Sequence, residues 1–179
     1  MTQNTDIAPE IPPRSTLPTG FRASGVAAGI KKNGKPDVAM IFSDRPCAGA
    51  AVFTTNRVKA APVLRGMAQM AADPGAFRAV VINAGCANAC TGAQGKRNAE
   101  TTARLAAKAL KIKAPQVLVM STGVIGAQLP MDKVAAGVVV PLAKALGIGS
   151  TVVNGSETLQ FAIPLPGFIG GYSEIPIDL

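Results

Sequence analysis

Histidine and tryptophan are missing from this 179-residue sequence, and tyrosine occurs only once. Because there is no imidazole, no Ser-His or Cys-His nucleophile pair can form, and any catalysis needs another base. Aromatic residues make up only 4% of the chain, which leaves few rings on which single-stranded nucleic acid could stack. The core must therefore consist of Ala, Val, Ile and Leu, whose small side chains favour close packing of elements.

Cysteine is also scarce. The three cysteines, Cys47, Cys86 and Cys90, are an odd number, and two of them form a single C-x₃-C pair. A zinc site would need a second pair of ligands, and no histidine can supply it. We therefore expect small, buried, reduced cysteines in a cytoplasmic protein, with no bound metal and no resident cofactor.

Charged residues are few, at 16%, although the formal net charge is +8. Few charges favour a surface that is partly covered by a partner or by more chain. The basic residues are scattered, which favours attraction to small carboxylates over nucleic-acid binding. No run reaches the roughly 18 consecutive apolar residues of a membrane helix. The polar, Pro-rich N-terminus lacks the apolar core of a secretory signal, so we expect a cytoplasmic protein.

The length suits one domain, and the composition divides the chain into three parts. We expect a flexible lead-in over 1–19 and a folded domain over 20–146. The tail, 147–179, contains no Lys or Arg, and its short apolar runs are broken by Pro and Gly. There we expect only weak strands, at 151–153 and 160–163.

The first third predicts an antiparallel β meander, because short apolar runs alternate with turn signals. Asn33-Gly34 is a hairpin signal between the first two runs. The expected strands lie within 21–30, at 38–42 and, after a turn at 43–46, at 50–53.

The remainder alternates strands and helices. Small apolar residues recur at helical spacing over 98–110, with Glu100 and Arg104 outside and spaced to pair. We expect a strand at 62–64 that continues as a short helix to 72, buried strands at 79–82 and 116–120, a helix from Met131, and a kink at Pro141.

Two loops of small polar residues follow the two buried strands. The first, NAGCANACTGAQG at 83–95, could be a metal site, a nucleophile, a phosphate cradle or a tight turn. Its glycines lack the spacing of a phosphate-binding loop, and Asn83 and Asn88 are typical turn-formers. The second begins Ser121-Thr122-Gly123 and could direct a hydroxyl and an N–H toward an oxyanion at a helix start. The alternative for either loop is a segment made small by packing.

Four segments together resemble the bifunctional glutamate/ornithine N-acetyltransferases of arginine biosynthesis, the ArgJ family. The likeness covers residues from about 20 to 146. The matching segments are GFRASGVAAGIKKNGKPDVAMIFSD at 20–44, AGAAVFTTNRVKAAPV at 48–63, AVVINAG with the loop that continues it to 95, and STGVIGAQLPMDKV at 121–134.

The resemblance implies a layered α/β/β/α sandwich of the type found in DmpA aminopeptidases and ornithine acetyltransferases. Such enzymes move acetyl from N-acetylornithine to glutamate, and some also use acetyl-CoA as a substrate. Their precursor cleaves itself into an α chain and a β chain, which form an α2β2 heterotetramer. The new N-terminal Thr of the β chain is the nucleophile and its amine the base, so no histidine is needed.

The same resemblance assigns Thr122 and Gly123 to the oxyanion hole, through the Thr hydroxyl and the Gly N–H. It implies no nucleophile and no metal ligand in this chain, and it identifies no substrate-binding residue.

The sequence departs from the family pattern in two places. Beyond about Gly147, the family's A-I-x-T-T-D-T-x-x-K segment and the residues before the catalytic Thr are absent. That leaves open a frameshifted or truncated product and a genuine divergence. Cys86 stands where relatives more often have Asn.

We therefore expect this chain to be inactive alone. The alternatives are a non-catalytic family fragment and an N-terminal-nucleophile aminopeptidase or amidase on the same fold.

Overall fold

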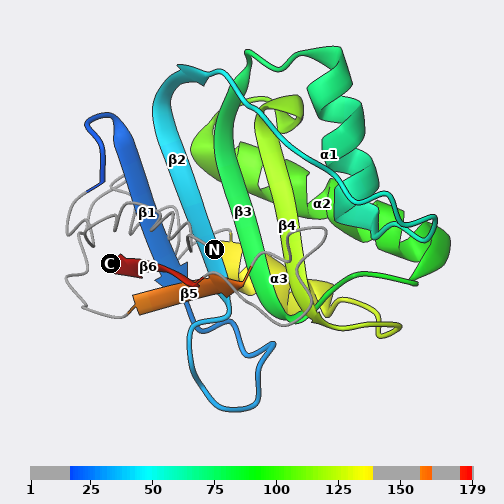
Figure 1. The fold of residues 1–179 in the computed structure, drawn as a ribbon. Coiled ribbons are helices and arrows are strands. Elements are labelled where there is room, and N and C mark those ends of the chain that lie inside the picture. The colour runs from blue at the N-terminus through cyan, green and yellow to red at the C-terminus, as the bar shows by residue number, and fades with distance from the viewer. Residues whose placement is uncertain (1–16, 139–157, 163–173, 179) are drawn as a thin grey trace, which may run out of the picture.

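The computed structural model describes residues 17–138 and the backbone of two later strands (Figure 1). The elements in chain order are β1 (Phe21–Val26), β2 (Val38–Cys47), α1 (Ala61–Ala72), β3 (Phe77–Cys86), α2 (Gly92–Leu110), the 3₁₀ turn η1 (Ala114–Gln116), β4 (Val117–Val124), α3 (Met131–Gly137), β5 (Thr158–Ala162) and β6 (Glu174–Asp178). Most of the expected lead-in, the expected strand at 151–153 and the kink at Pro141 lie outside the described residues.

The first four strands form one mixed sheet in the order β1-β2-β3-β4. β1 pairs with β2, and β2 with β3, in antiparallel fashion, whereas β3 and β4 are parallel. Parallel neighbours need a crossover, and α2 supplies it. The predicted strand–helix–strand unit is therefore confirmed. β5 and β6 form a separate antiparallel pair.

The core lies between the sheet and the helices behind it (Figure 1). Alternate side chains of the central strands, among them Met40, Val81 and Val119, are buried on the face that α2 covers. α2 meets them with alanines, and Ala103 and Ala106 are fully buried. Such small side chains let the helix lie close to the strands, as expected from the scarcity of aromatic residues.

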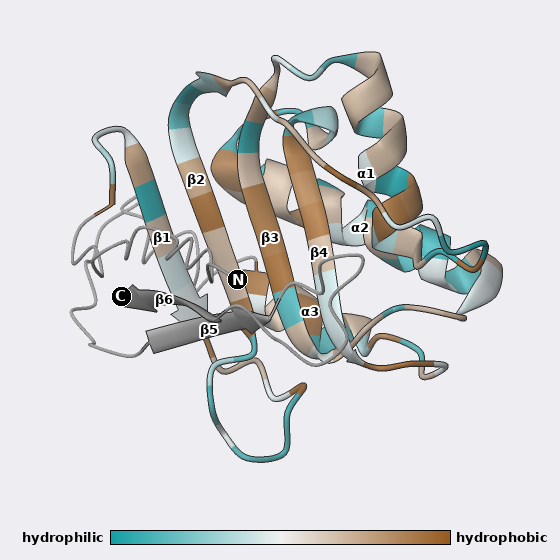
Figure 2. Ribbon diagram, in the orientation of Figure 1, coloured by the Kyte–Doolittle hydropathy of each residue, from teal (hydrophilic) through white to brown (hydrophobic). Residues whose placement is uncertain are grey.

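The opposite face of the sheet is apolar as well, as the brown strands in Figure 2 indicate. Side chains alternate along a strand, so Ile41, Val80 and Leu118 point away from the core face. These three are only half-buried, and Met120 in the same set is 39% exposed. A sheet that is apolar on both faces is typical of a layer covered on both sides.

The expected three-stranded meander is wrong in its last strand. β2 does not stop at the predicted turn but continues through an irregularity to Cys47, and β3 takes the neighbouring position. Within the irregularity the Ser43 hydroxyl donates to the Arg45 carbonyl. Residues 50–53 form no strand: Val52 is 80% exposed, and the Phe53 ring lies against Gly66 of α1. The segment therefore crosses a helix instead of extending the sheet.

Two local expectations are also corrected. No strand forms at 62–64, because α1 begins at Ala61 and a proline is accepted in the first turn of a helix. Glu100 does not pair with Arg104. Its carboxylate instead receives the Nε–H of Arg65 from α1 at 3.0 Å, while Arg104 donates to Thr101 one turn back. The hairpin, the helix over 98–110 and the strand beginning at Val117 agree with the sequence analysis.

The connection between β1 and β2 is organised by Asp37, which is 3% exposed. Its carboxylate accepts the main-chain N–H groups of Ala28 and Lys31 at 2.6 and 2.8 Å. Its own carbonyl accepts the N–H of Ala84 on β3. The Asp37 side chain thus organises the hairpin connection, and its main chain joins that connection to the end of the strand that carries the first polar loop.

Candidate functional site

The two polar segments singled out in the sequence lie side by side. In the parallel register of β3 and β4, Asn83 pairs with Ser121, Ala84 with Thr122, and Gly85 with Gly123. Parallel strands bring their carboxyl ends to the same edge of a sheet, which is where α/β proteins commonly hold ligands. This edge is the candidate functional site.

Thr122 and Gly123 lie on β4 and not in a loop, and both are exposed. Gly123 has a φ of 129°, and a Cβ there would clash with Gly85 and lie 2.6 Å from the Cys86 nitrogen. The packing explanation therefore accounts for this glycine. The helix expected from Met131 is confirmed as α3, which begins well beyond this segment. A main-chain donor here is therefore a strand-end N–H and not the N–H of a helix start.

The first polar segment is a strand end followed by a tight turn. Its first four residues still belong to β3, and the helix begins at Gly92. Asn88, which is fully buried, has a φ of 48°. Its amide donates to the Gly95 carbonyl at 2.9 Å and accepts the Thr91 hydroxyl at 2.8 Å. Asn88 therefore holds the turn, as expected, whereas Asn83 still lies in β3 and donates to the Cys86 carbonyl of the same strand.

The turn after β3 and the segment after β4 are bonded to each other. The Ala87 N–H donates to the Val124 carbonyl and the Gly126 N–H to the Ala89 carbonyl, both at 2.9 Å. The Gln128 side chain adds a donor to the Thr91 carbonyl at 3.2 Å. These contacts hold the strand end that carries Thr122 and Gly123 against the start of α2.

The cysteines differ in exposure from what was expected. Cys86 is buried, but Cys47 is only half-buried and Cys90 is exposed, and all three are free thiols. Cys90 is exposed because it lies in the surface turn before α2, with a φ of 56°. Within the described ranges, no three His, Cys, Asp or Glu side chains gather in a way that could hold a metal ion.

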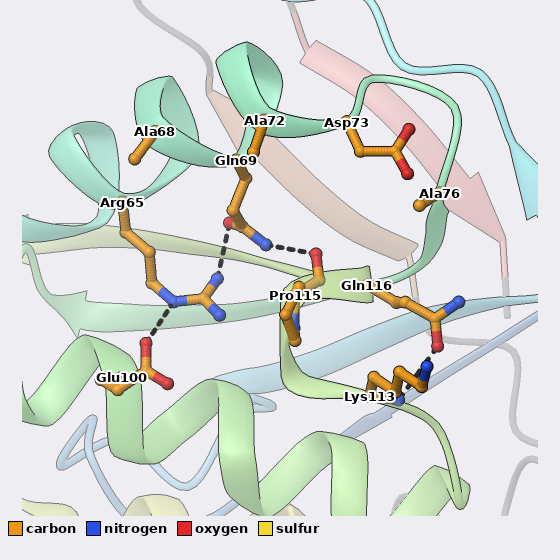
Figure 3. Close-up of a pocket in the computed structure, with 10 residues that line it drawn as sticks. All are labelled: Arg65, Ala68, Gln69, Ala72, Asp73, Ala76, Glu100, Lys113, Pro115 and Gln116. Carbon is orange, nitrogen blue, oxygen red and sulfur yellow. Dashed lines mark hydrogen bonds and ion pairs between the residues drawn. The ribbon is translucent and has the colours of Figure 1, made fainter.

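A hollow of about 510 Å³ opens at the other end of the sheet, between α1, α2 and η1 (Figure 3). Its lining includes Arg65, Gln69 and Glu100. It lies by the start of β4, about 20 Å along the strand from Gly123 at the usual rise per residue. The hollow is therefore separate from the edge that carries the polar segments.

Arg65 in this hollow is occupied by structural contacts. Its guanidinium donates to the Glu100 carboxylate and to the carbonyls of Ala114 and Val117 at 2.9 and 2.6 Å. It also donates to the side-chain oxygen of Gln69. No sequence pattern predicted this junction. Arg65 is the only charged residue of α1, and that was the available signal.

Comparison with known proteins identifies the family of this chain. The sequence model of the ArgJ family matches residues 22–162. A protein of Rhodopirellula baltica named "Arginine biosynthesis bifunctional protein ArgJ" is 52% identical over 136 residues, or 75% of this chain and 33% of that protein. A Thermobifida fusca protein of the same name is 55% identical over 146 residues, or 81% of this chain and 37% of that protein. The chain thus spans about a third of the length of these curated relatives.

Solved structures give the same result. A Mycobacterium tuberculosis ornithine acetyltransferase complexed with ornithine is 48% identical, with a TM-score of 0.68, over 72% of this chain and 68% of that one. An ArgJ structure from Bacillus halodurans is 31% identical, with a TM-score of 0.64. The chain has the layered α/β/β/α fold of the ornithine acetyltransferases, of which it supplies an N-terminal portion. It belongs to the ArgJ family.

Proposed function

We propose that this chain is the α portion of a glutamate/ornithine N-acetyltransferase of arginine biosynthesis, acting in the cytoplasm. Family membership carries the proposal, together with the two polar strand ends at one edge of the sheet. Acetyl passes from N-acetylornithine to glutamate, with acetyl-CoA as a second acetyl donor. The excess of basic residues, +8 overall, attracts these carboxylate substrates.

In this proposal Thr122 and Gly123 stabilise the oxyanion. Attack on the acetyl carbonyl places negative charge on its oxygen, and donors fixed in advance stabilise that charge. Thr122 is exposed at the strand end and shares the sheet face of Met120, away from the α2 core. The Gly123 main chain is held by close packing against Gly85. Both groups are thus accessible from the face that the helices leave open.

The nucleophile comes from a β chain produced by self-cleavage of the same precursor, in an α2β2 assembly. The apolar surface beside the site supports such a partner. Val124 and Ile125, which directly follow the oxyanion pair, are 61% and 67% exposed. Large apolar side chains exposed together mark an interaction surface.

The decisive experiment supplies the missing partner. The chain is purified alone and after co-expression with the C-terminal two-thirds of the Thermobifida fusca relative, and acetyl transfer from N-acetylornithine to glutamate is assayed. We expect turnover only in the co-purified assembly. Turnover by the chain alone would contradict the need for a partner. An assembly that hydrolyses small peptides but transfers no acetyl would favour the aminopeptidase alternative. A stable assembly with neither activity would favour a non-catalytic fragment.

The oxyanion assignment has its own test. Thr122→Ala in the active assembly should lower the rate of acetyl transfer by about 10²–10³, the usual cost of one lost oxyanion donor. Thr101→Ala, a change of the same kind on the outer face of α2, is the control. An unchanged rate in Thr122→Ala would remove this residue from the mechanism.

A further inference from the structure

Two buried polar atoms lie together directly behind the oxyanion segment. Asn83 is 3% exposed, and its Oδ1 has no hydrogen-bond partner among the described residues; the same holds for the buried Oγ of Ser121. The two residues are register partners on the parallel strands β3 and β4. Their side chains therefore project to the same face of the sheet, side by side.

That face is the helix-covered one. Asn83 follows Val81, and Ser121 follows Val119, by two residues, and both valines belong to the core. Val38, the register partner of Asn83 on β2, is 1% exposed and also belongs to it. A partner chain on the open face of the sheet would not reach these two atoms.

The orientation of the Asn83 amide is determined by its other end. Its Nδ2 donates to the Cys86 carbonyl at 2.8 Å. Turning the amide over would place two oxygens against each other, so Oδ1 must be the group that lacks a donor. Buried polar atoms in native proteins nearly always have a partner, in many cases an ordered water.

We propose that Asn83 and Ser121 bind one buried water molecule between the ends of β3 and β4, and that this pair positions the oxyanion segment. The water accepts a hydrogen bond from the Ser121 hydroxyl and donates one to Asn83 Oδ1. The water thereby links Ser121, which precedes Thr122, to Asn83, which lies two residues before Gly85. Gly123 packs against Gly85. Ser121 and Asn83 are positioning residues, and this role rests on the proposed function of Thr122 and Gly123.

The water site is tested first by a crystal structure of the active two-chain assembly at a resolution that shows ordered waters. We expect one water within hydrogen-bonding distance of both Asn83 Oδ1 and Ser121 Oγ. A direct bond between the two side chains, or a protein donor to Asn83 Oδ1, would overturn the site. Because this measurement uses the unmodified chain, it does not depend on any variant folding.

The positioning role is tested by kinetics on the same assembly. Ser121→Ala should lower kcat for acetyl transfer by about tenfold with KM unchanged, because a displaced oxyanion donor acts on the transition state. Rates are divided by the fraction of enzyme that becomes acetylated, which removes any loss due to misfolding. Ser43→Ala, which alters a buried serine at the far end of β2, should leave kcat unchanged.

The outcomes separate the two proposals. If Thr122→Ala is slow and Ser121→Ala is as fast as the parent, the positioning role is wrong and the oxyanion assignment stands. If Thr122→Ala is as fast as the parent, the oxyanion assignment fails and the positioning role fails with it.

Discussion

Two glycines with positive φ lie at the end of β4, and they are needed for different reasons. Gly123 combines a φ of 129° with main-chain contact from the neighbouring strand. Gly126 has a φ of 83°, yet nothing lies within 4 Å of where its Cβ would be. The pair separates the energetic cost of backbone conformation from the cost of a steric clash.

Gly123→Ala should therefore destabilise the chain by roughly 2–5 kcal/mol, because backbone strain and overpacking add. Gly126→Ala should cost only about 1–2 kcal/mol, the penalty of a left-handed conformation for an L-residue. Urea unfolding of the two purified variants measures both. Equal losses would mean that β3 moves aside and that the close contact at Gly123 carries no cost.

Asp37 is a second residue whose role the sequence did not reveal. Asp37→Asn keeps the shape of the side chain but removes one charged acceptor, so one of the Ala28 and Lys31 N–H groups is left without its partner. We expect a loss of about 1.5–3 kcal/mol in the free energy of unfolding, typical of a charged hydrogen bond. Asn33→Ala, in the exposed turn of the same connection, should change stability by less than about 0.5 kcal/mol. Similar values for the two variants would contradict the anchoring role.

At the scale of elements, one side chain joins α1 to α2, η1 and β4. The Arg65 guanidinium reaches carbonyls of the last two and the carboxylate of Glu100, and its side chain is 12% exposed. The Ala114 carbonyl also accepts the Val117 N–H, and the Val117 carbonyl also accepts the Gln69 amide, so Arg65 adds a charged donor to each.

Arg65→Lys should cost about 2–4 kcal/mol, because an ammonium cannot reproduce the planar fork that serves four separate acceptors. Arg104→Lys, on the exposed face of α2, is the matched control and should cost less than about 0.5 kcal/mol. Thermal or urea unfolding of both variants provides the comparison. A stable Arg65→Lys variant would show that water replaces the fork at no cost.

The elements that could be predicted are those with a strong local period. α2 was expected over 98–110 from its alanine spacing, and the apolar residues of that spacing are buried, although the helix begins earlier, at Gly92. The run at 50–53 looked equally like a strand, yet it lies across α1. Whether a short apolar run joins a sheet depends on whether a neighbouring edge is free, and β3, 30 residues later, had taken the edge of β2. Local pattern contains no information on that competition.

At the scale of the whole molecule, the described residues leave large apolar side chains exposed on the sheet face that the helices do not cover. The open sheet face ends in Met120, and the exposed Val124 and Ile125 continue it past the oxyanion pair. In the function proposed above, the β chain packs on this surface. No helix in the described part of the chain is long and apolar enough to cross a bilayer.

Val124→Ser together with Ile125→Ser should therefore weaken association with the partner chain while leaving this chain's fold intact. We expect the free energy of unfolding of the isolated chain to change by less than about 0.5 kcal/mol, since the side chains are exposed. The yield of co-purified partner should fall at least about tenfold, as when buried interface anchors are lost. Val52→Ser, at the most exposed apolar side chain away from the strand ends, is the control. An unchanged yield would place the interface elsewhere.

The sequence by itself determined the family, the absence of any histidine-based chemistry, and the two polar segments that follow buried strands. It did so because local composition and residue spacing depend only on the order of residues along the chain and not on their tertiary contacts. Only the tertiary structure decided that β3 and β4 are adjacent and in parallel register, so that Asn83 and Ser121 stand beside each other behind Thr122 and Gly123. Pairing between segments about 40 residues apart depends on the burial of the whole sheet, and no short stretch of chain records it.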